Sequence, residues 1–237
     1  MDNLEIGSIA EKLAGNRYPG RGVILGLTPD GTRSVAAYFI MGRSQNSRNR
    51  VFLPEPDGIR TEAHDPALLQ DPSLILYHPV RVYDHWLIVT NGDQSDTVRD
   101  YLRRGANFES ALRTRCFEPD GPNWTPRISG LVDLESGGYR LSILKAADPA
   151  GSACLRQSFE YPPLPGLGHF LHTYACDGNP LPSFRGEPER VETLDDPDAY
   201  TELLWQNLDQ DNKISLYVRY TALRDGSVEQ RIVNKHM

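Results

Sequence analysis

Three arginines lie within eight residues in a polar loop that follows an apolar run. Arg43, Arg48 and Arg50 stand among Ser and Asn residues, directly after the apolar and aromatic stretch 35–41. Three guanidinium groups this close repel one another unless water or an anion compensates them, and their planar donors match phosphate and carboxylate. The spacing therefore predicts an anion site at the end of a core strand. The alternative is a solvated surface loop, since most arginines are exposed.

Two further cationic positions accompany this loop. Arg21 lies between Gly20 and Gly22, where the missing side chains would let backbone amides approach a ligand. An ordinary turn into a strand is the alternative, because Pro-Gly marks turns strongly. Tyr77 and Arg81 have polar tips inside an apolar region, so they either reach water at strand ends or point into a pocket.

The segment 116–128 is both polar and stiff. Its three prolines restrict the backbone, and stiff polar loops are suited to hold catalytic groups on a scaffold. Its candidate side chains are Glu118, Asp120, Asn123, Thr125 and Arg127. Upstream, Asp93 and Asp96 open a segment with helical spacing, and helix capping alone explains these two acids.

The remaining motif search excludes several kinds of chemistry. No nucleotide-binding glycine loop, H-E-x-x-H or G-x-S-x-G motif is present, so ATP or NAD use is unsupported and no cofactor is expected. His169 and His172 lie three apart without a third ligand nearby, which favours packing over a metal site. Cys116, Cys154 and Cys176 lie far apart, which indicates neither a disulfide framework nor a thiolate zinc site.

The charge balance excludes partners that are recognised through bulk charge. The chain carries 32 acidic and 25 basic side chains, a formal net charge of −7, which argues against binding nucleic acid or an anionic membrane surface. No apolar stretch reaches the length of a membrane span, and the first residues are acidic where a signal peptide is basic. A cytoplasmic protein with a small-molecule ligand is expected. A homo-oligomer remains open.

Turn signals divide the chain into short strands with few helices. Hairpins are expected at 23–27 with 34–41, 80–83 with 86–90, 128–134 with 139–145 and 214–222 with 228–233, and short strands separated by turn residues are expected at 51–53 and 59–63. Further strands are expected at 74–77 and 155–161, and helical segments at 7–14, 93–104, 108–113 and from 197. Because the helices are amphipathic but too few for a βαβ wheel, we expect an α+β fold of packed, mostly antiparallel sheets with helices outside. One domain spanning 1–237 is preferred.

Five blocks, in order between residues 18 and 147, resemble the archaeal-type IMP cyclohydrolase family. They are Arg21-Gly22, Tyr38-Phe-Ile-Met-Gly-Arg-Ser44 with Asn49-Arg50, Tyr77-His-Pro-Val-Arg81, Asn91-Gly-Asp-Gln-Ser-Asp-Thr97 and Asn123-Trp-Thr-Pro-Arg-Ile128. The later stretch 168–184 resembles the longer, bacterial branch of that family. The role of residues 165–186 is not predicted.

The resemblance implies a reaction and a fold. The reaction is closure of 5-formamidoimidazole-4-carboxamide ribonucleotide to inosine monophosphate with loss of water, without a cofactor. The fold is a four-layer α/β/β/α sandwich like that of N-terminal-nucleophile hydrolases. Asp2 follows Met1, where that class has Cys, Ser or Thr, so covalent catalysis from the N-terminus is not expected.

The resemblance also implies roles for the candidate residues. Tyr77 and Glu118 are the expected proton donor and acceptor, and Asp120 is the substitute if Glu118 points to solvent. Trp124 interrupts the family's spacing, so the choice between the two acids stays open. The expected substrate-binding residues are Arg21, Arg43, Arg48 and Arg50, for the 5′-phosphate, with Arg81, Asn91, Asp96, Asn123, Thr125 and Arg127.

Two other functions fit the same residues. A non-catalytic purine-nucleotide-binding protein, or an amidohydrolase acting on another small substrate, would share the fold and the arginines. A binding protein would need the arginines but not the proton-transfer pair. Tyr77 and Glu118 therefore discriminate between these functions.

Overall fold

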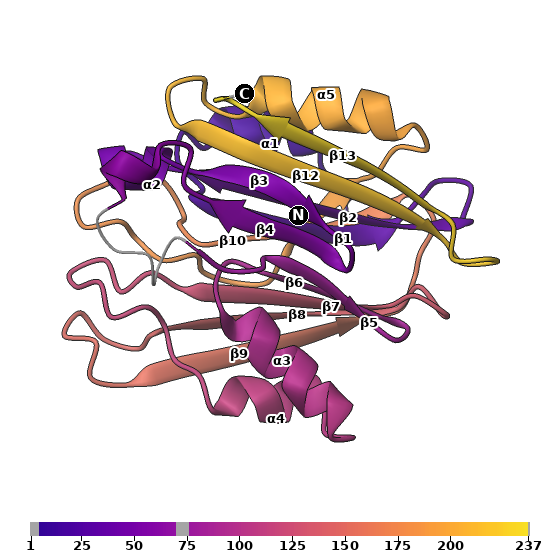
Figure 1. The fold of residues 1–237 in the computed structure, drawn as a ribbon, viewed down its shortest axis with the longest axis horizontal. Helices are drawn as coiled ribbons and strands as arrows, with labels where there is room; N and C mark the ends of the chain where they lie inside the picture. The colour runs from indigo at the N-terminus through magenta and orange to yellow at the C-terminus, as the bar shows by residue number, and fades with distance from the viewer. Residues whose placement is uncertain (1–4, 70–75, 237) are drawn as a thin grey trace.

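The computed structural model describes residues 5–69 and 76–236, and its framework is two antiparallel sheets (Figure 1). The first is six-stranded, in the order β11-β10-β1-β2-β12-β13, and the second is seven-stranded, in the order β3-β4-β5-β6-β7-β8-β9. The first sheet contains β1 (Arg21–Leu27), β2 (Arg33–Met41), β10 (Leu167–His172), β11 (Glu189–Glu192), β12 (Lys213–Ala222) and β13 (Val228–Asn234). The second contains β3 (Val51–Glu55), β4 (Gly58–Glu62), β5 (Val80–Tyr83), β6 (Trp86–Thr90), β7 (Arg127–Asp133), β8 (Tyr139–Ala146) and β9 (Cys154–Tyr161).

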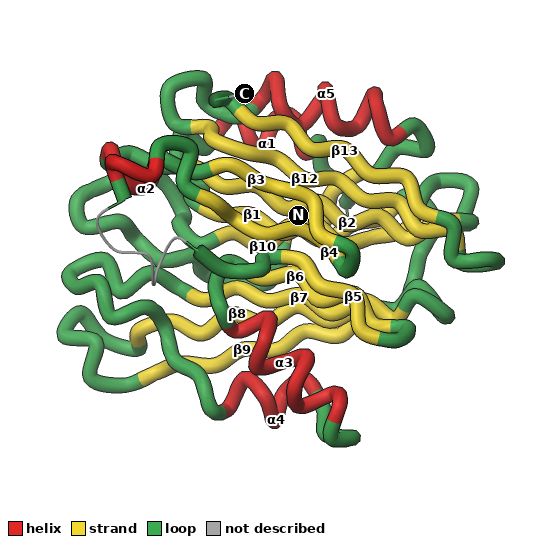
Figure 2. Tube along the Cα trace, viewed as in Figure 1, coloured by secondary structure: helices red, strands yellow, loops and turns green. Residues whose placement is uncertain are grey.

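Helices lie against the outer faces of both sheets (Figure 2). α1 (Ile9–Gly15) and α5 (Pro197–Asn207) pack on the first sheet, and α3 (Gln94–Arg103) and α4 (Phe108–Arg113) pack on the second. The connections contain α2 (Gln45–Arg48) and the short 3-10 helix η1 (Pro66–Leu68). Within the described chain, no helix is long and apolar enough to cross a membrane.

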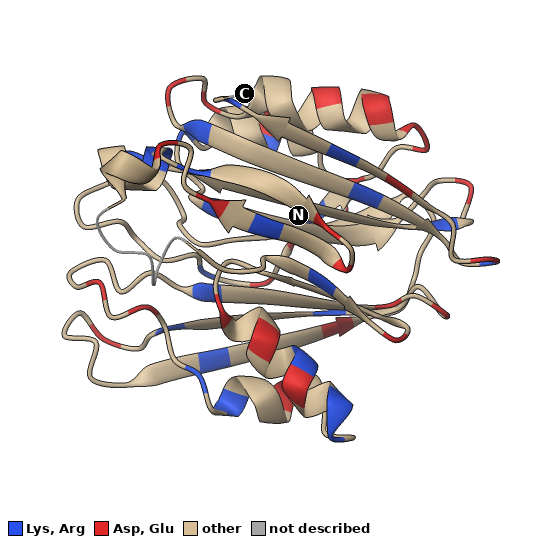
Figure 3. Cartoon of the chain, in the orientation of Figure 1, with Lys and Arg blue, Asp and Glu red and all other residues tan. Residues whose placement is uncertain are grey.

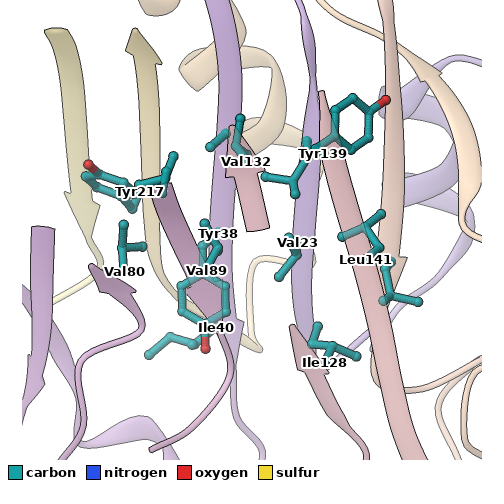
Figure 4. Close-up of a cluster of buried hydrophobic side chains, with 14 of the residues drawn as sticks. Val23, Tyr38, Ile40, Val80, Val89, Ile128, Val132, Tyr139, Leu141 and Tyr217 are labelled. Carbon is teal, nitrogen blue, oxygen red and sulfur yellow. The ribbon is translucent and has the colours of Figure 1, made fainter. Parts of the chain in front are cut away.

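The apolar run of β2 is continuous because both faces of this strand are buried. Its alternate side chains pack on opposite faces: Phe39 lies under the helices, while Tyr38 and Ile40 face the second sheet. A strand buried on both faces has no polar face, so apolar residues follow one another without alternation. The core between the sheets contains side chains from both of them, including Val23, Tyr38, Val89 and Leu141 (Figure 4).

The four predicted hairpins, the strands at 51–53 and 59–63 and the α+β class are confirmed by this structure. The predicted strand 74–77 lies partly outside the described residues, and Tyr77, which is described, is not in a strand. Met1 and Asp2, on which the expectation about the N-terminal nucleophile rests, also lie outside them. The structure adds α2, η1, β10 and β11, which were not predicted, and α2, η1 and β11 are short and have no periodic apolar pattern.

Packing alone accounts for Gly20 and Gly22, and the approach of their amides to a ligand stays a prediction. A Cβ on Gly22 would lie 2.3 Å from the Phe39 ring, and a Cβ on Gly20 would lie 2.3 Å from Thr173 Oγ1. Gly20 also has a φ of +79°, which favours glycine. Gly20 directly precedes β1 and Gly22 is its second residue, so both lie next to Arg21 where the strand begins.

Candidate active site

A cavity of about 290 Å³ lies at the edge where β1 begins and β2 ends. Arg21 pairs with Ile40 in the antiparallel register, so the turn before β1 and the loop after β2 meet at this edge. The loop that leads into β7 completes the wall. Figure 3 shows basic residues gathered beside α2, in this part of the molecule. The sequence-predicted residues that line the cavity are Arg21, Arg43, Arg50, Glu118, Asp120, Asn123 and Thr125.

Arg21 is held by its backbone and leaves donors free for a ligand. Its N–H donates to Thr173 Oγ1 at 3.1 Å, and its carbonyl accepts from Thr173 N at 3.0 Å. Its buried Nε has no hydrogen-bond partner within the described part of the chain. Burial lowers the pKa of Arg21, but the nearby Glu118 carboxylate raises it, and the net pKa is above its ordinary value. The guanidinium is therefore charged.

Arg50 is a second cation in the same cavity, and only 1% of its surface is exposed. Its Nε donates to Ser47 O at 2.9 Å, while its Nη2 has no partner among residues 5–69 and 76–236. Burial lowers the pKa of Arg50, and the charge of Arg21 lowers it further. A buried guanidinium with an unused donor beside another cation is stabilised by an anion.

Glu118 provides the buried carboxylate of the cavity. It is 5% exposed, and its backbone N–H donates to Thr125 O at 2.9 Å. Burial raises the pKa of Glu118 above its ordinary value, although the charges of Arg21 and Arg127 oppose this. A glutamate with a raised pKa can both accept and donate a proton closer to neutral pH than an exposed one.

Asp120 has a different environment, because its carboxylate is already bonded to the loop. Its Oδ1 accepts from Thr125 N at 2.6 Å, and its Oδ2 accepts from the Thr125 hydroxyl. That hydroxyl also lies 2.6 Å from Tyr174 Oη. Both carboxylate oxygens of Asp120 thus stabilise the conformation of the loop. Glu118 is therefore the acid whose carboxylate is more available to a ligand.

Arg43 lines the cavity at its mouth and already has an anionic partner. Its Nη1 donates to Asp177 Oδ1 at 2.6 Å and to Gly178 O at 3.0 Å. Its guanidinium also lies over the Tyr18 ring, 5.0 Å from the ring centroid. Arg43 therefore ties the segment around Asp177 to this wall and is less available to a ligand than Arg21 or Arg50.

Arg48 does not line the cavity with the other arginines of its loop. Residues Gln45–Arg48 form α2, and a helical turn sends successive side chains in different directions. Arg48 Nε donates to Gly42 O at 3.0 Å, and its Nη2 contacts Asn212 Oδ1 at 3.4 Å. It fastens the loop to the start of β12.

Tyr77 lies behind the cavity and is not part of its lining. Its hydroxyl is 3.0 Å from that of Tyr38 in the core between the sheets. The two phenols are close to the cavity cations, since Arg21 and Arg50 both lower the pKa of Tyr38 against the dominant effect of burial.

Three other predicted binding residues have protein partners. Arg81 bonds Asp96 at 2.5 Å and Asp57 at 3.0 Å, on the far side of β5. The buried Asn91 donates to Pro126 O at 2.8 Å and accepts from Ile128 N at 2.9 Å. Both sets of contacts hold the second sheet and α3 together, away from the cavity.

The capping interpretation of Asp93 is wrong, and Arg127 is part of the reason. Asp93 precedes α3 but makes no side-chain cap hydrogen bond. Its Oδ1 accepts from Arg127 Nη1 at 2.8 Å and also from Arg115. The backbone of Asp93 is in the αR region and not in the extended region usual for an N-cap, and its carboxylate pairs with the two guanidinium groups instead. Arg127 Nη1 also donates to Gln94 Oε1 at 2.7 Å.

Sequence reasoning missed six lining residues and misjudged the effect of one insertion. The missed residues are Tyr18, Ser44, Asn46, Ser47, Tyr174 and Leu181. Ser44, Asn46 and Ser47 lie inside the arginine loop, and this proximity was the available signal. Trp124, which interrupts the family spacing, has a φ of 45° and donates from Nε1 to Pro149 O at 3.0 Å. The extra residue thus bulges outward and leaves Glu118 and Thr125 at the cavity.

Comparison with known proteins identifies similar sequences. The family model described as IMP cyclohydrolase-like protein matches residues 18–226. The IMP cyclohydrolase of Methanosphaera stadtmanae is 31% identical over 127 residues, which cover 52% of this chain and 61% of the relative. That of Methanopyrus kandleri is 33% identical over 123 residues, which cover 50% of this chain and 60% of the relative. The chain therefore spans about 60% of the length of these curated relatives.

Proposed function

The chain belongs to the IMP cyclohydrolase-like family, and from this premise we propose that it closes 5-formamidoimidazole-4-carboxamide ribonucleotide to inosine monophosphate. The observation that supports this proposal is the pair Arg21 and Arg50, each with a buried donor nitrogen that has no partner among the described residues, in one cavity with Glu118. Three arginines (Arg21, Arg43 and Arg50) and two carboxylates (Glu118 and Asp120) line the cavity, which leaves an excess of positive charge that suits a phosphate group. The 5′-phosphate of the substrate supplies that group.

The cavity also contains polar groups suited to the rest of a nucleotide. Asn46 Oδ1 is buried and has no hydrogen-bond partner within the described ranges, so it can accept from a ribose hydroxyl. Tyr18 and Tyr174 are stacked, with ring centroids 5.9 Å apart, and both rings line the cavity. An aromatic wall of this kind favours a planar base.

Ring closure requires positioning and proton transfer. The carboxamide nitrogen attacks the carbon of the neighbouring formamido group, so an N–C bond forms and the formyl oxygen becomes a hydroxyl. Glu118 accepts a proton from the attacking nitrogen and passes it to the formyl oxygen, which forms the hydroxyl. It then accepts the proton of the formamido nitrogen and gives it to that hydroxyl, so that water leaves and a C=N bond forms. The enzyme chiefly holds the two groups in contact, because both are already on one ring. No step consumes a cofactor.

Glu118 is the proposed acid and base because it is buried, faces the cavity and is not held by the loop. Asp120 is committed to Thr125 by both oxygens. Tyr77 remains a proposed proton donor, but its hydroxyl would act from behind the arginines, beside Tyr38. Arg43 is proposed to bind the substrate only at the mouth of the cavity.

The proposal extends to the fold and the cellular setting. We propose that the two sheets and their outer helices are one domain, arranged as a four-layer α/β/β/α sandwich like that of N-terminal-nucleophile hydrolases. Because the three cysteines are free, we place the protein in a reducing cytoplasm.

The test is a direct assay. The purified protein is mixed with the formylated ribonucleotide, and inosine monophosphate is followed by ultraviolet absorbance. We expect the product to appear, and Glu118→Gln to reduce its rate while inosine monophosphate still binds. Binding without turnover in the wild-type protein would contradict the proposal and favour a nucleotide-binding protein.

A further inference from the structure

Two cysteines that are far apart in the sequence meet beside the loop of Glu118. Cys116 follows α4, and Cys154 opens β9. The guanidinium of Arg156 links the two segments: Nη1 donates to Cys154 O at 3.2 Å, and Nη2 donates to Arg115 O at 2.8 Å. One side chain therefore holds the backbone on either side of the cysteine pair.

The sulfur of Cys154 is in contact with the other segment. It lies near the Cys116 thiol and the backbone N–H of Phe117, and the Cys154 thiol donates to Leu155 O at 3.7 Å. Burial raises the pKa of the Cys154 thiol, and the Cys116 thiol raises it further. Cys116 is exposed, whereas Cys154 is half-buried and packs with the side chains under α3 and α4. The pair thus has one accessible and one shielded sulfur.

We propose that Cys116 and Cys154 form a dithiol site that reacts with small disulfides of the glutathione class and closes to an intramolecular disulfide. A disulfide requires Cα atoms within about 7 Å and Cβ atoms that point together. The two hydrogen bonds of Arg156, to Cys154 O and Arg115 O, hold the two segments together, and the nearness of the thiols favours this geometry. In the cytoplasm such bonds are transient and sense redox state.

The chemistry is two thiol–disulfide exchanges. The thiolate of exposed Cys116 attacks one sulfur of the small disulfide, which forms a mixed disulfide and releases one small thiolate. Cys154 then loses its proton and attacks Cys116 Sγ, which expels the second small thiolate. The two protein thiols are oxidised, the small disulfide is reduced to two thiols, and the two protons pass to the released thiolates.

The cross-link would act on the loop of the candidate site. Cys116 lies two residues before Glu118, whose backbone N–H is bonded to Thr125. A bond to Cys154 would fasten this loop to β9. We expect the oxidised protein to melt about 5 °C higher than the reduced protein, because the cross-link restricts the unfolded chain.

The experiment uses the full chain and does not depend on its enzymatic activity. The native protein is incubated with oxidised glutathione and examined by intact mass and peptide mapping, before and after dithiothreitol. We expect the loss of two hydrogens, a single linked peptide pair containing Cys116 and Cys154, and reversal of the rise in Tm by dithiothreitol. Cys176, which is exposed and lies in another segment, provides the matched control: Cys176→Ser should behave like the wild type.

The variants separate the two steps. Cys154→Ser should stop at a glutathione adduct on Cys116, and Cys116→Ser should form no cross-link. Melting curves of the reduced variants show that each is folded. A stable glutathione adduct on Cys116 in the wild-type protein, no reaction at either sulfur, or a link through Cys176 would each overturn the proposal.

Discussion

Arg21 and Arg50 are two cations confined to a cavity in which Glu118 is the buried carboxylate. The charged form of Arg50 is the less favourable of the two in the folded protein, because burial and the charge of Arg21 both lower its pKa. A residue that opposes folding in this way is explained by a bound anion. The contacts of Arg48 and Arg43 show that proximity in sequence does not assign the same role to neighbouring arginines.

Replacing Arg50 tests the phosphate contact. Arg50→Met keeps the apolar stem and removes the charge, so we expect KM to rise about 10- to 100-fold with little change in kcat. Arg48→Met removes the same charge from the same loop outside the cavity, and its KM should stay within about threefold. Arg43→Ala should fall between them, because Arg43 is already paired. Equal increases in KM for Arg48→Met and Arg50→Met would indicate that the phosphate does not bind at Arg50.

Replacing Glu118 and Tyr77 tests proton transfer. Glu118→Gln keeps shape but cannot exchange a proton, so kcat should fall by about 10²-fold or more. Tyr77→Phe should lower kcat by the same order if its hydroxyl takes part. Turnover and Tm are measured on the same preparations, and Asp120→Asn serves as the control for the second acid. Near-normal turnover in Glu118→Gln would refute the assignment.

The raised pKa of Glu118 also predicts a dependence of stability on pH. Burial favours the protonated form, so the folded protein binds this proton more tightly than the unfolded chain. The contribution is fully present below the ordinary pKa of glutamate and is lost as pH rises through the folded value. Glu118→Gln should therefore be more stable than the wild type at pH 7, and the difference should shrink towards pH 4. Urea titrations at both pH values measure it, and a difference that grows at low pH would contradict the sign.

At the scale of elements, β1 and β2 place the cationic residues and depend on close packing. Gly22 in β1 lies against the rings of Phe39 and Phe170, which belong to its two neighbours in the sheet. Any side chain there would separate β1 from these rings. Gly105, after α3, has the positive φ of +74° that favours glycine, but a Cβ at this position would meet nothing within 4 Å. Its constraint is therefore in the backbone and not in packing.

These two glycines give a matched pair of variants. Gly22→Ala would place a methyl group 2.3 Å from the Phe39 ring, and we expect a loss of about 2 to 3 kcal/mol in the free energy of unfolding. Gly105→Ala meets only backbone strain and should cost about 1 kcal/mol. Urea unfolding compares them. A larger loss at Gly105 would show that packing around β1 adjusts easily.

At the scale of the whole molecule, an acidic protein carries a cationic cavity. The net charge of −7 gives no general attraction for a phosphate ester, so recognition is local to Arg21 and Arg50. Long-range repulsion is screened at physiological salt, where the Debye length is about 8 Å. Binding of a nucleotide should then relieve the repulsion within the cavity and stabilise the entire fold.

Recognition through Arg21 and Arg50 predicts that a ligand raises Tm mainly when it carries a phosphate. At about 100 times its Kd, inosine monophosphate should stabilise the protein by about 2.7 kcal/mol and raise Tm by roughly 5 to 10 °C. Inosine, which lacks the phosphate, should give a much smaller shift at the same concentration, and Arg50→Met should lose most of the nucleotide effect. Equal Tm shifts with inosine and inosine monophosphate would contradict a phosphate contact in the cavity.

The sequence by itself determined the elements and the family blocks, because the signals for both are local. The apolar run in β2 and the turn at Pro29-Asp30-Gly31 predicted the first hairpin without knowledge of its neighbours. The polar, proline-rich loop marked Glu118 and Asp120 as candidates in the same way. Only the tertiary structure separated them, since Asp120 is bonded to Thr125 while Glu118 is buried beside Arg21.

The same distinction applies to the arginines and cysteines. Spacing placed Arg43, Arg48 and Arg50 in one loop, but α2 and the partners Asp177 and Asn212 decided which of them reach the cavity. Cys116 and Cys154 gave no sequence signal, and folding brings them together. The physical reason is that periodicity and turn chemistry act over a few residues. Burial and polar contacts join residues more than 30 positions apart, so only the packed chain decides them.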